Sequence, residues 1–170
     1  MATIEALSIR AATPDDLDVV DRLFQRSYPR LLRAQYPPSV CVTTIPILAR
    51  AQPALLRSGT YFLAEREGRV VGAGGWTPAL RESGRASRLG VGHVRHVVTD
   101  HRHLRRGIGR RLLAHVMTDA RRAGMAELRC QSTLTAAPFY RALGFEEVGP
   151  LSVELPRGIA FASILMRRPI

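Results

Sequence analysis

The stretch "VVTDHRHLRRGIGRRLL", residues 97–113, decides the fold class of this chain. Its valine-rich beginning continues a strand pattern that starts at residue 90, and its end continues as a helical pattern to about residue 123. A glycine pair, Gly107 and Gly109, separates the strand from the helix. Four arginines surround that pair: Arg105, Arg106, Arg110 and Arg111. The order strand, glycine loop, helix predicts an α/β unit with a basic, glycine-containing loop at the start of the helix.

This loop has the makings of an anion site. The first N–H groups of a helix have no partner within the helix, and the helix dipole favours negative charge at the same end. Glycine at 107 and 109 lets a phosphate approach the backbone. The loop lacks the third glycine of a dinucleotide fingerprint and the Gly-Lys-Ser/Thr ending of a Walker loop. Two interpretations stay open, phosphate binding and a solvated arginine-rich turn.

Composition favours one domain over residues 1–170 with anionic partners. The chain is 46% hydrophobic, which is enough for an ordinary core. Its net charge is +11, and all 25 basic residues are arginines. The planar arginine side chain binds phosphate through two parallel hydrogen bonds, so phosphate-bearing ligands fit this balance.

Cysteine use and hydropathy indicate the setting. Two cysteines, Cys41 and Cys130, make neither a metal cluster nor a disulfide framework, and we expect no metal site. We find no signal peptide and no apolar stretch long enough for a membrane span. We therefore expect a reducing, cytoplasmic location and no membrane partner. The sequence leaves the oligomeric state open, with a homodimer as one option.

The remaining patterns alternate between strand and helix. We expect strands over residues 4–10, 60–67, 69–76, 90–99, 126–131, 145–148 and 160–166. We expect helices from Thr13 to about residue 29, in short pieces over 39–59, from the glycine loop to 123, and over 135–143, with an exposed loop at 81–88. With hairpins at both ends, this order predicts an α/β domain whose mixed central β-sheet is flanked by helices.

Two motifs together resemble the GNAT-type N-acetyltransferase family. The opening stretch is followed by "STLTAAPFYRALGFEEVG" at residues 132–149, and the resemblance covers roughly residues 90–149. The family loop reads Gln/Arg-x-x-Gly-x-Gly/Ala, and here Leu104 stands at its first position. "FYRALGF", residues 139–145, matches the family's Phe-Tyr-x-x-x-Gly-Phe ending.

The resemblance implies a GNAT-like domain with acetyl-coenzyme A as donor and an amine of a small molecule, peptide or protein as acceptor. It implies that the coenzyme A pyrophosphate lies on the loop N–H groups, while the pantetheine arm runs along the strand before the loop. Thr135 takes the place of a family asparagine that touches this arm. The implied cofactor-binding residues are Val97, Val98, Thr99, Leu104, Arg105, Arg106, Gly107, Ile108, Gly109, Arg110 and Thr135.

Acetyl transfer by direct attack needs two proton carriers. Tyr140 matches the family tyrosine that reaches the sulfur and would act as general acid, against a reading as core aromatic. His93 would act as base, against a structural strand role, since imidazole titrates near neutrality. Strand alternation puts His93, Arg95 and Val97 on one face and His96 on the other. Arg95 would hold an acceptor carboxylate or pair with a buried acid.

The acceptor site and two alternative functions also follow from the sequence. The resemblance implies an acceptor site built from the first two helical segments and the sheet rim, with aromatic candidate walls at Phe24, Tyr28, Tyr36 and Trp76. A nucleic-acid-binding basic module is one rival, but only 6% of residues are aromatic and none interleaves with the arginines, so we expect no specific nucleic acid partner. A non-catalytic acyl-coenzyme A sensor is the other rival.

Overall fold

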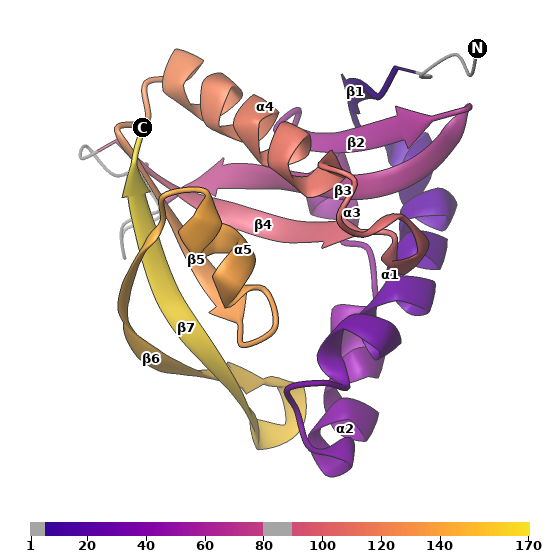
Figure 1. The fold of residues 1–170 in the computed structure, drawn as a ribbon, viewed down its shortest axis with the longest axis vertical. Coiled ribbons are helices and arrows are strands. Elements are labelled where there is room, and N and C mark those ends of the chain that lie inside the picture. The colour runs from indigo at the N-terminus through magenta and orange to yellow at the C-terminus, as the bar shows by residue number, and fades with distance from the viewer. Residues whose placement is uncertain (1–5, 80–89) are drawn as a thin grey trace.

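The structure, a computed structural model, describes residues 6–79 and 90–170. Its centre is a seven-stranded sheet in the order β1-β2-β3-β4-β5-β7-β6 (Figure 1). The strands are β1 (Ser8–Ala11), β2 (Tyr61–Arg66), β3 (Arg69–Pro78), β4 (Val91–Thr99), β5 (Glu127–Thr133), β6 (Glu146–Leu155) and β7 (Ile159–Pro169). Only β4 and β5 pair in parallel, and all other neighbours are antiparallel. The predicted mixed α/β sheet is confirmed.

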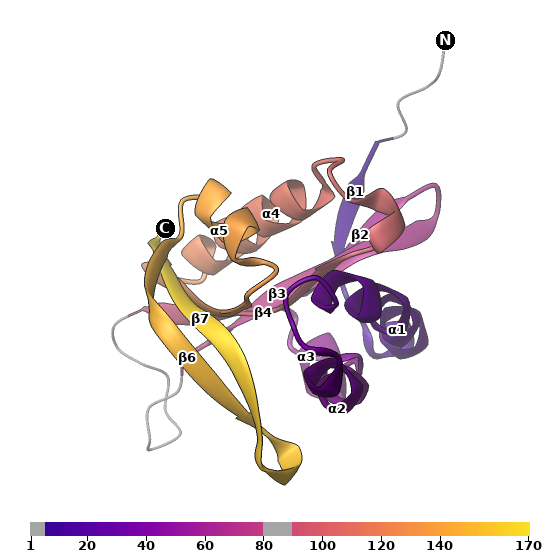
Figure 2. The same ribbon diagram turned by 60° about the horizontal axis from the view of Figure 1, so that its bottom comes forward.

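Helices cover both faces of the sheet. They are α1 (Leu17–Leu32), α2 (Pro38–Leu48), α3 (Pro53–Leu56), α4 (Ile108–Arg122) and α5 (Ala137–Ala142). Figure 2 shows α4 and α5 on one face and α1, α2 and α3 on the other. Each face has its own apolar core, one around Leu112 and Leu128 beneath α4, the other around Leu23 and Leu63 beneath α1. No helix in the described part of the chain is long and apolar enough to cross a bilayer.

Several predicted boundaries differ from the structure. The first strand, expected over residues 4–10, runs from Ser8 to Ala11, where it pairs with β2, and residues 1–5 lie outside the described part. The last two strands are far longer than the predicted 145–148 and 160–166. Pro150 does not end β6, because β6 is the edge strand of the sheet and a missing N–H is tolerated there. The loop expected at 81–88 also lies outside the described residues.

A bulge in β4 changes which side chains share a face. His96 has φ 40°, and the register with β3 shifts at this point, so two β4 residues oppose one β3 residue. As a result Val94 and Val97 both pack in the core under α4, whereas His96 stacks on Phe24 of α1. The predicted alternation was therefore wrong for Val97 and for His96. The bulge directs His96 toward the α1 face of the sheet. His93 and Arg95 point to the same face, because they are the strand neighbours of Val94, which points to the α4 face.

The two parallel strands at the centre of the sheet separate soon after they meet. β4 pairs with β5 only from Val91–Glu127 to His93–Arg129. Beyond that point the rest of β4, through Thr99, has no strand on its β5 side. Figure 1 shows the strands diverging toward the end where α4 begins. This divergence opens the sheet at its centre and positions the candidate site.

Candidate active site

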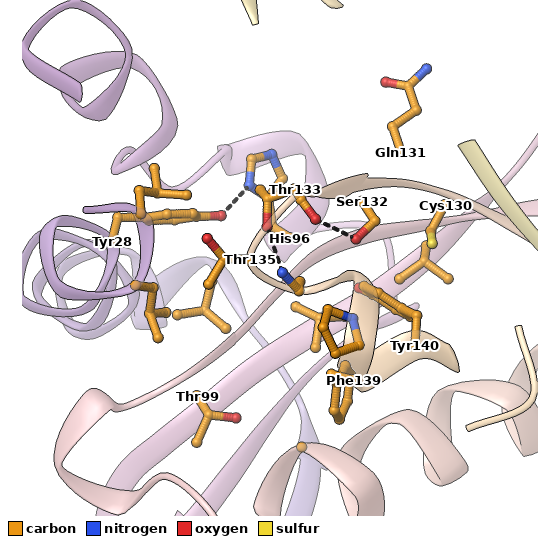
Figure 3. Close-up of a pocket in the computed structure, with 18 of the residues that line it drawn as sticks. Tyr28, His96, Thr99, Cys130, Gln131, Ser132, Thr133, Thr135, Phe139 and Tyr140 are labelled. Atoms are coloured by element: carbon orange, nitrogen blue, oxygen red, sulfur yellow. Dashed lines mark hydrogen bonds between the residues drawn. The ribbon is translucent and has the colours of Figure 1, made fainter. Parts of the chain in front are cut away.

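A cavity of about 860 Å³ lies where β4 and β5 diverge. One wall is β4 with the loop that leads into α4, and the opposite wall is the end of β5 with α5. The far end is closed by α1 and by the β6–β7 hairpin. Figure 3 shows side chains from α1, β4, β5 and α5 turned toward this common space.

The cavity collects almost every residue that the sequence nominated. Tyr140 and His93 both line it. So do ten of the eleven nominated cofactor-binding residues: Val97, Val98, Thr99, Leu104, Arg105, Gly107, Ile108, Gly109, Arg110 and Thr135. Arg106 does not line it. The structure thus brings together residues from three separate elements, as a binding site requires.

The start of α4 presents unpaired N–H groups to one end of the cavity. Gly107 is the N-cap with φ 75°, a left-handed conformation that favours glycine. The first backbone hydrogen bond of the helix runs from Arg111 N–H to the Gly107 carbonyl at 3.1 Å. The N–H groups of Ile108, Gly109 and Arg110 therefore precede the ladder and remain available to an anion.

The need for glycine at position 109 has a different structural cause from that at position 107. A Cβ at this position would lie 3.0 Å from the Phe139 ring and 3.3 Å from the Thr99 hydroxyl oxygen. Only glycine lets α5 and the end of β4 pack so closely against the helix start. The two glycines of the motif therefore do different work, one in the turn and one in packing.

A buried carboxylate orders the turn between β4 and this loop. Asp100 is 1% exposed and accepts hydrogen bonds from Arg26 Nε and Arg102 Nη2, each at 2.9 Å. It also accepts the Arg102 backbone N–H at 2.9 Å. Burial pushes the pKa of Asp100 upward, but the hydrogen bonds from Arg102 and Arg26 outweigh it and hold that pKa well below its usual value. An ionised Asp100 thus ties α1 to the loop that leads to α4.

Tyr140 lines the cavity between the end of β5 and the start of α4. It comes from α5, is 6% exposed, and packs edge-on against Phe139 and Phe145. None of the described residues hydrogen-bonds its hydroxyl, and Figure 3 shows the side chain directed into the pocket beside Cys130. Burial raises the pKa of Tyr140 well above 10, so its phenol keeps its proton near neutrality. Tyr140 can therefore donate a proton inside the cavity.

Two histidines of β4 face the α1 side and differ in their surroundings. His93 is half-buried, and its pKa is lowered by burial and by the charges of Arg95 and Arg129, which favours the neutral base. The His96 Nδ1 atom lies 3.4 Å from the Tyr28 hydroxyl (Figure 3). The His96 Nε2 atom lies 3.0 Å from Gln52 Nε2. Burial lowers the pKa of His96 to about 4. His96 is thus held by hydrogen bonds on the α1 side, whereas no hydrogen bond joins the His93 ring to another residue in the part of the chain that the structure describes.

Two buried polar atoms in the cavity wall, the Thr135 hydroxyl oxygen and His103 Nδ1, have no hydrogen-bond partner among the described residues. Buried hydroxyls normally form hydrogen bonds, since leaving one unpaired costs about 1–3 kcal/mol. A ligand with an amide or carbonyl group would satisfy the Thr135 hydroxyl.

Of the four aromatic residues predicted to line the acceptor site, only Tyr28 lines the cavity. Phe24 lies behind His96, and Tyr36 lies behind Phe161, with ring centroids 4.5 Å apart. Trp76 is on the α4 face, where its indole N–H donates to Asp119 at 2.8 Å, so the nomination of Trp76 was wrong.

Sequence reasoning missed a group of cavity residues from distant elements: Leu31, Leu48, Cys130, Gln131, Ser132, Thr133, Val153, Leu155, Phe161 and Ser163. The β5 residues follow a predicted strand, and only its divergence from β4 exposes them. The β6 and β7 residues had no local signal, because their contact with the site depends on the full length of the hairpin. Among residues 6–79 and 90–170, no cluster of His, Cys, Asp or Glu could hold a metal ion.

Comparison with known proteins agrees with this geometry. The family model described as the Acetyltransferase (GNAT) domain matches residues 57–147. The chain shares its fold with the GCN5-related N-acetyltransferase titled Aminotransferase, Class-II from Rhodopseudomonas palustris, at TM-score 0.74 and 18% identity over 100% of both chains.

Two further solved structures have the same fold. PaiA N-acetyltransferase from Thermoplasma acidophilum, solved in complex with coenzyme A, gives TM-score 0.68 at 12% identity, covering 97% of this chain and 99% of that one. Ribosomal-protein-alanine N-acetyltransferase from Brucella melitensis gives TM-score 0.64 at 23% identity, covering 96% and 99%. No curated protein matches the chain.

Proposed function

The chain belongs to the GNAT acetyltransferase family, and from that premise we propose that it moves an acetyl group from acetyl-coenzyme A to an amine in the cavity between β4 and β5. The observation that carries this proposal is the arrangement of the cavity: a basic helix start at one end, an unpaired strand edge along one wall, and the Tyr140 hydroxyl between them.

The donor half is supported by the loop before α4. The N–H groups of residues 104–110 would hold the pyrophosphate, and Arg105 and Arg110, which line the cavity, would neutralise it. The pantetheine amides would pair with β4 near Val97, Val98 and Thr99, since that edge has no strand partner. The orphaned Thr135 hydroxyl supports the same placement from the opposite wall. Leucine at 104 is compatible with this scheme, because the backbone carries the contacts.

The acceptor half is supported by the two proton carriers. In direct transfer the amine nitrogen attacks the thioester carbonyl carbon, the carbon–sulfur bond breaks, the nitrogen loses a proton and the sulfur gains one. His93, neutral near pH 7 because its pKa is lowered, would accept the proton from the amine, directly or through water. Tyr140, protonated because its pKa is raised, would donate to the sulfur.

A covalent route through Cys130 is disfavoured. Cys130 lines the cavity near Tyr140, but burial raises its pKa to about 12. The thiolate is the nucleophilic form of cysteine, and it is scarce near neutrality at such a pKa. We therefore assign a single displacement within one complex of donor and acceptor.

Initial-velocity kinetics test this proposal. Release of coenzyme A thiol should depend on the added amine, and reciprocal plots against both substrates should intersect, as a ternary complex requires. Cys130→Ala should retain turnover, because the cysteine takes no part in the chemistry. Parallel reciprocal plots, together with loss of turnover in Cys130→Ala, would show an acetyl-cysteine route. Amine-independent binding of acetyl-coenzyme A without turnover would favour the sensor alternative.

A further inference from the structure

The cavity has an apolar end that lies apart from the residues proposed to bind the donor. Leu31 and Leu32 of α1 and Leu48 of α2 line it on one side, and Val153, Leu155 and Phe161 of the β6–β7 hairpin line it on the other. In Figure 1, α2 and the tip of the β6–β7 hairpin lie at the bottom, well below the loop before α4, where the pyrophosphate would sit. An apolar surface of this kind favours a hydrophobic group on the acceptor.

The apolar end has a fixed wall. Tyr36 stacks on Phe161 with ring centroids 4.5 Å apart. The Tyr36 hydroxyl donates to the Ala162 carbonyl at 2.7 Å and accepts the Leu134 N–H at 2.8 Å. One buried side chain thus joins the α1–α2 connection to both β7 and the segment after β5. The pocket is therefore held open by hydrogen bonds rather than by loosely packed loops.

The charged side chains that line the cavity are all positive among the described residues. Among the described residues no aspartate or glutamate lines it, and its charged side chains are arginines: Arg95, Arg105 and Arg110. The nearest buried carboxylate, Asp100, is taken up by Arg26 and Arg102. A second ammonium group on the acceptor would find no carboxylate here and would pay for desolvation. Diamines and other polycations are therefore poor acceptors for this site.

One of these arginines is placed for the acceptor rather than the donor. Arg95 lies on β4 two residues beyond His93, and its Nε donates to the Thr77 hydroxyl at 2.8 Å. No described carboxylate lies within salt-bridge distance of it. No hydrogen bond joins its two Nη groups to another described residue. A guanidinium whose Nη groups meet a carboxylate binds it strongly and with defined geometry.

We infer that the acceptor is an amino acid with an apolar side chain, whose carboxylate binds Arg95, whose side chain fills the apolar end, and whose α-amine faces His93. This inference rests on the proposed function and narrows its acceptor. The reaction joins the α-nitrogen to the acetyl carbon, breaks the carbon–sulfur bond, and yields an N-acetyl amino acid and coenzyme A thiol.

A matched set of amines tests this assignment in the intact protein with acetyl-coenzyme A. The set is leucine, leucinamide without the carboxylate charge, 3-methylbutylamine without the carboxyl group, glycine without the side chain, and 1,5-diaminopentane. Thiol release should be fastest with leucine by kcat/KM. Arg95→Gln should raise KM for leucine about 10- to 100-fold, and should affect 3-methylbutylamine much less.

Two control variants separate specific effects from general ones. Arg122→Gln removes an arginine charge from an exposed position at the end of α4, outside the cavity, and should leave the KM for leucine near the wild-type value. Leu155→Gln should lower kcat/KM more for leucine than for glycine. Val42→Gln, at an exposed position of α2, should leave kcat/KM for both amines near the wild-type values.

The failures of the two proposals look different. If leucinamide or the diamine is acetylated and leucine is not, or if Arg95→Gln weakens all amines equally, the amino acid assignment is overturned while acetyl transfer stands. If acetyl-coenzyme A binds and no amine in the set promotes thiol release, amine acetylation itself fails and the assignment falls with it.

Discussion

At the scale of single residues, the account depends on a phenol that keeps its proton. Tyr140 is buried, its hydroxyl faces the cavity, and its pKa is raised well above 10 by burial. Tyr140→Phe removes only the hydroxyl, so kcat should fall roughly 10- to 1000-fold, with water supplying the residual rate. Calorimetry should find acetyl-coenzyme A affinity within about twofold of wild type. An unchanged kcat would remove Tyr140 from the chemistry.

His93 predicts a pH dependence with a definite sign. Its pKa is lowered from 6.5 by burial and by Arg95 and Arg129, and the neutral ring is the base. The value of kcat/KM should therefore stay constant near neutrality and decrease with falling pH below 6.5, where the His93 ring becomes protonated. In His93→Gln the rate should drop and this decrease at acidic pH should vanish. If the decrease persists in His93→Gln with near-normal rate, His93 is a structural strand residue.

Some site residues could be predicted from the sequence, and the side of the sheet that His96 faces could not. Tyr140 was identified from its motif and His93 from the titration range of an imidazole on the predicted strand, and both line the cavity. The side of the strand taken by His96 was missed, because the bulge that turns it depends on pairing with β3, a segment that starts more than twenty residues earlier in the chain. Period-two alternation assumes an uninterrupted ladder, and a bulge breaks it.

At the scale of elements, the start of α4 carries the donor site. Gly107 has φ 75° and nothing within 4 Å of a Cβ built there, so space is free but the conformation disfavours other residues. Gly107→Ala should lower stability by roughly 1 kcal/mol through backbone strain. Gly107→Asp should add a negative charge and weaken acetyl-coenzyme A binding more than Gly107→Ala does, as measured by calorimetry. Equal affinity in the two variants would place the pyrophosphate elsewhere.

The entry to α1 predicts an acid-dependent stability. Asp16 is 8% exposed and accepts two hydrogen bonds from Arg10, at 2.9 and 2.8 Å. These bonds lower the pKa of Asp16 from 3.8 to about 2. Because its pKa is lower in the folded protein than in the unfolded chain, the ionised Asp16 carboxylate stabilises the fold at pH values above its unfolded pKa. This contribution is lost as the pH falls from about 4 to about 2. The contribution is roughly 2 kcal/mol.

Urea unfolding at two pH values checks this contribution. Asp16→Asn should be less stable than wild type at pH 7, and the gap should narrow at pH 3 as the wild-type carboxyl begins to protonate. A gap of equal size at both pH values would show that the loss is not due to the charge of Asp16.

Elements with strong local signals were predicted best. The hairpin of β2 and β3 was found because Glu67 and Gly68 form a tight turn with positive φ between two apolar runs. The β6–β7 hairpin was underestimated, because Gly149 and Pro150 look like an end of a strand unless its edge position is known. Local patterns report the turn, and only tertiary pairing reports the length.

At the scale of the whole molecule, the net charge of +11 predicts attraction to polyanions. DNA affinity should fall steeply with rising salt and show no preference for sequence, because phosphate contacts alone would drive it. Fluorescence anisotropy with two unrelated duplexes at several salt concentrations measures this. A tight complex selective for one duplex at physiological salt would restore the nucleic-acid module as a rival.

The global arrangement explains which parts of the site were predictable. The donor half lies within one continuous stretch, residues 90–149, so its motifs could be seen in order along the chain. The acceptor half joins α1 and α2 to the β6–β7 hairpin, more than one hundred residues away in sequence. Its apolar lining, and the position of Arg95 beside that lining, emerge only when these segments meet.

The most direct test of the central claim follows the acetyl group itself. The protein is incubated with ¹³C-acetyl-coenzyme A and the amine set above, and products are identified by mass spectrometry while thiol release is counted. We expect labelled N-acetyl product and free thiol in equal amounts, with the rates of both reduced by the same factor in Tyr140→Phe. Stoichiometric binding of acetyl-coenzyme A without labelled product from any amine would contradict it.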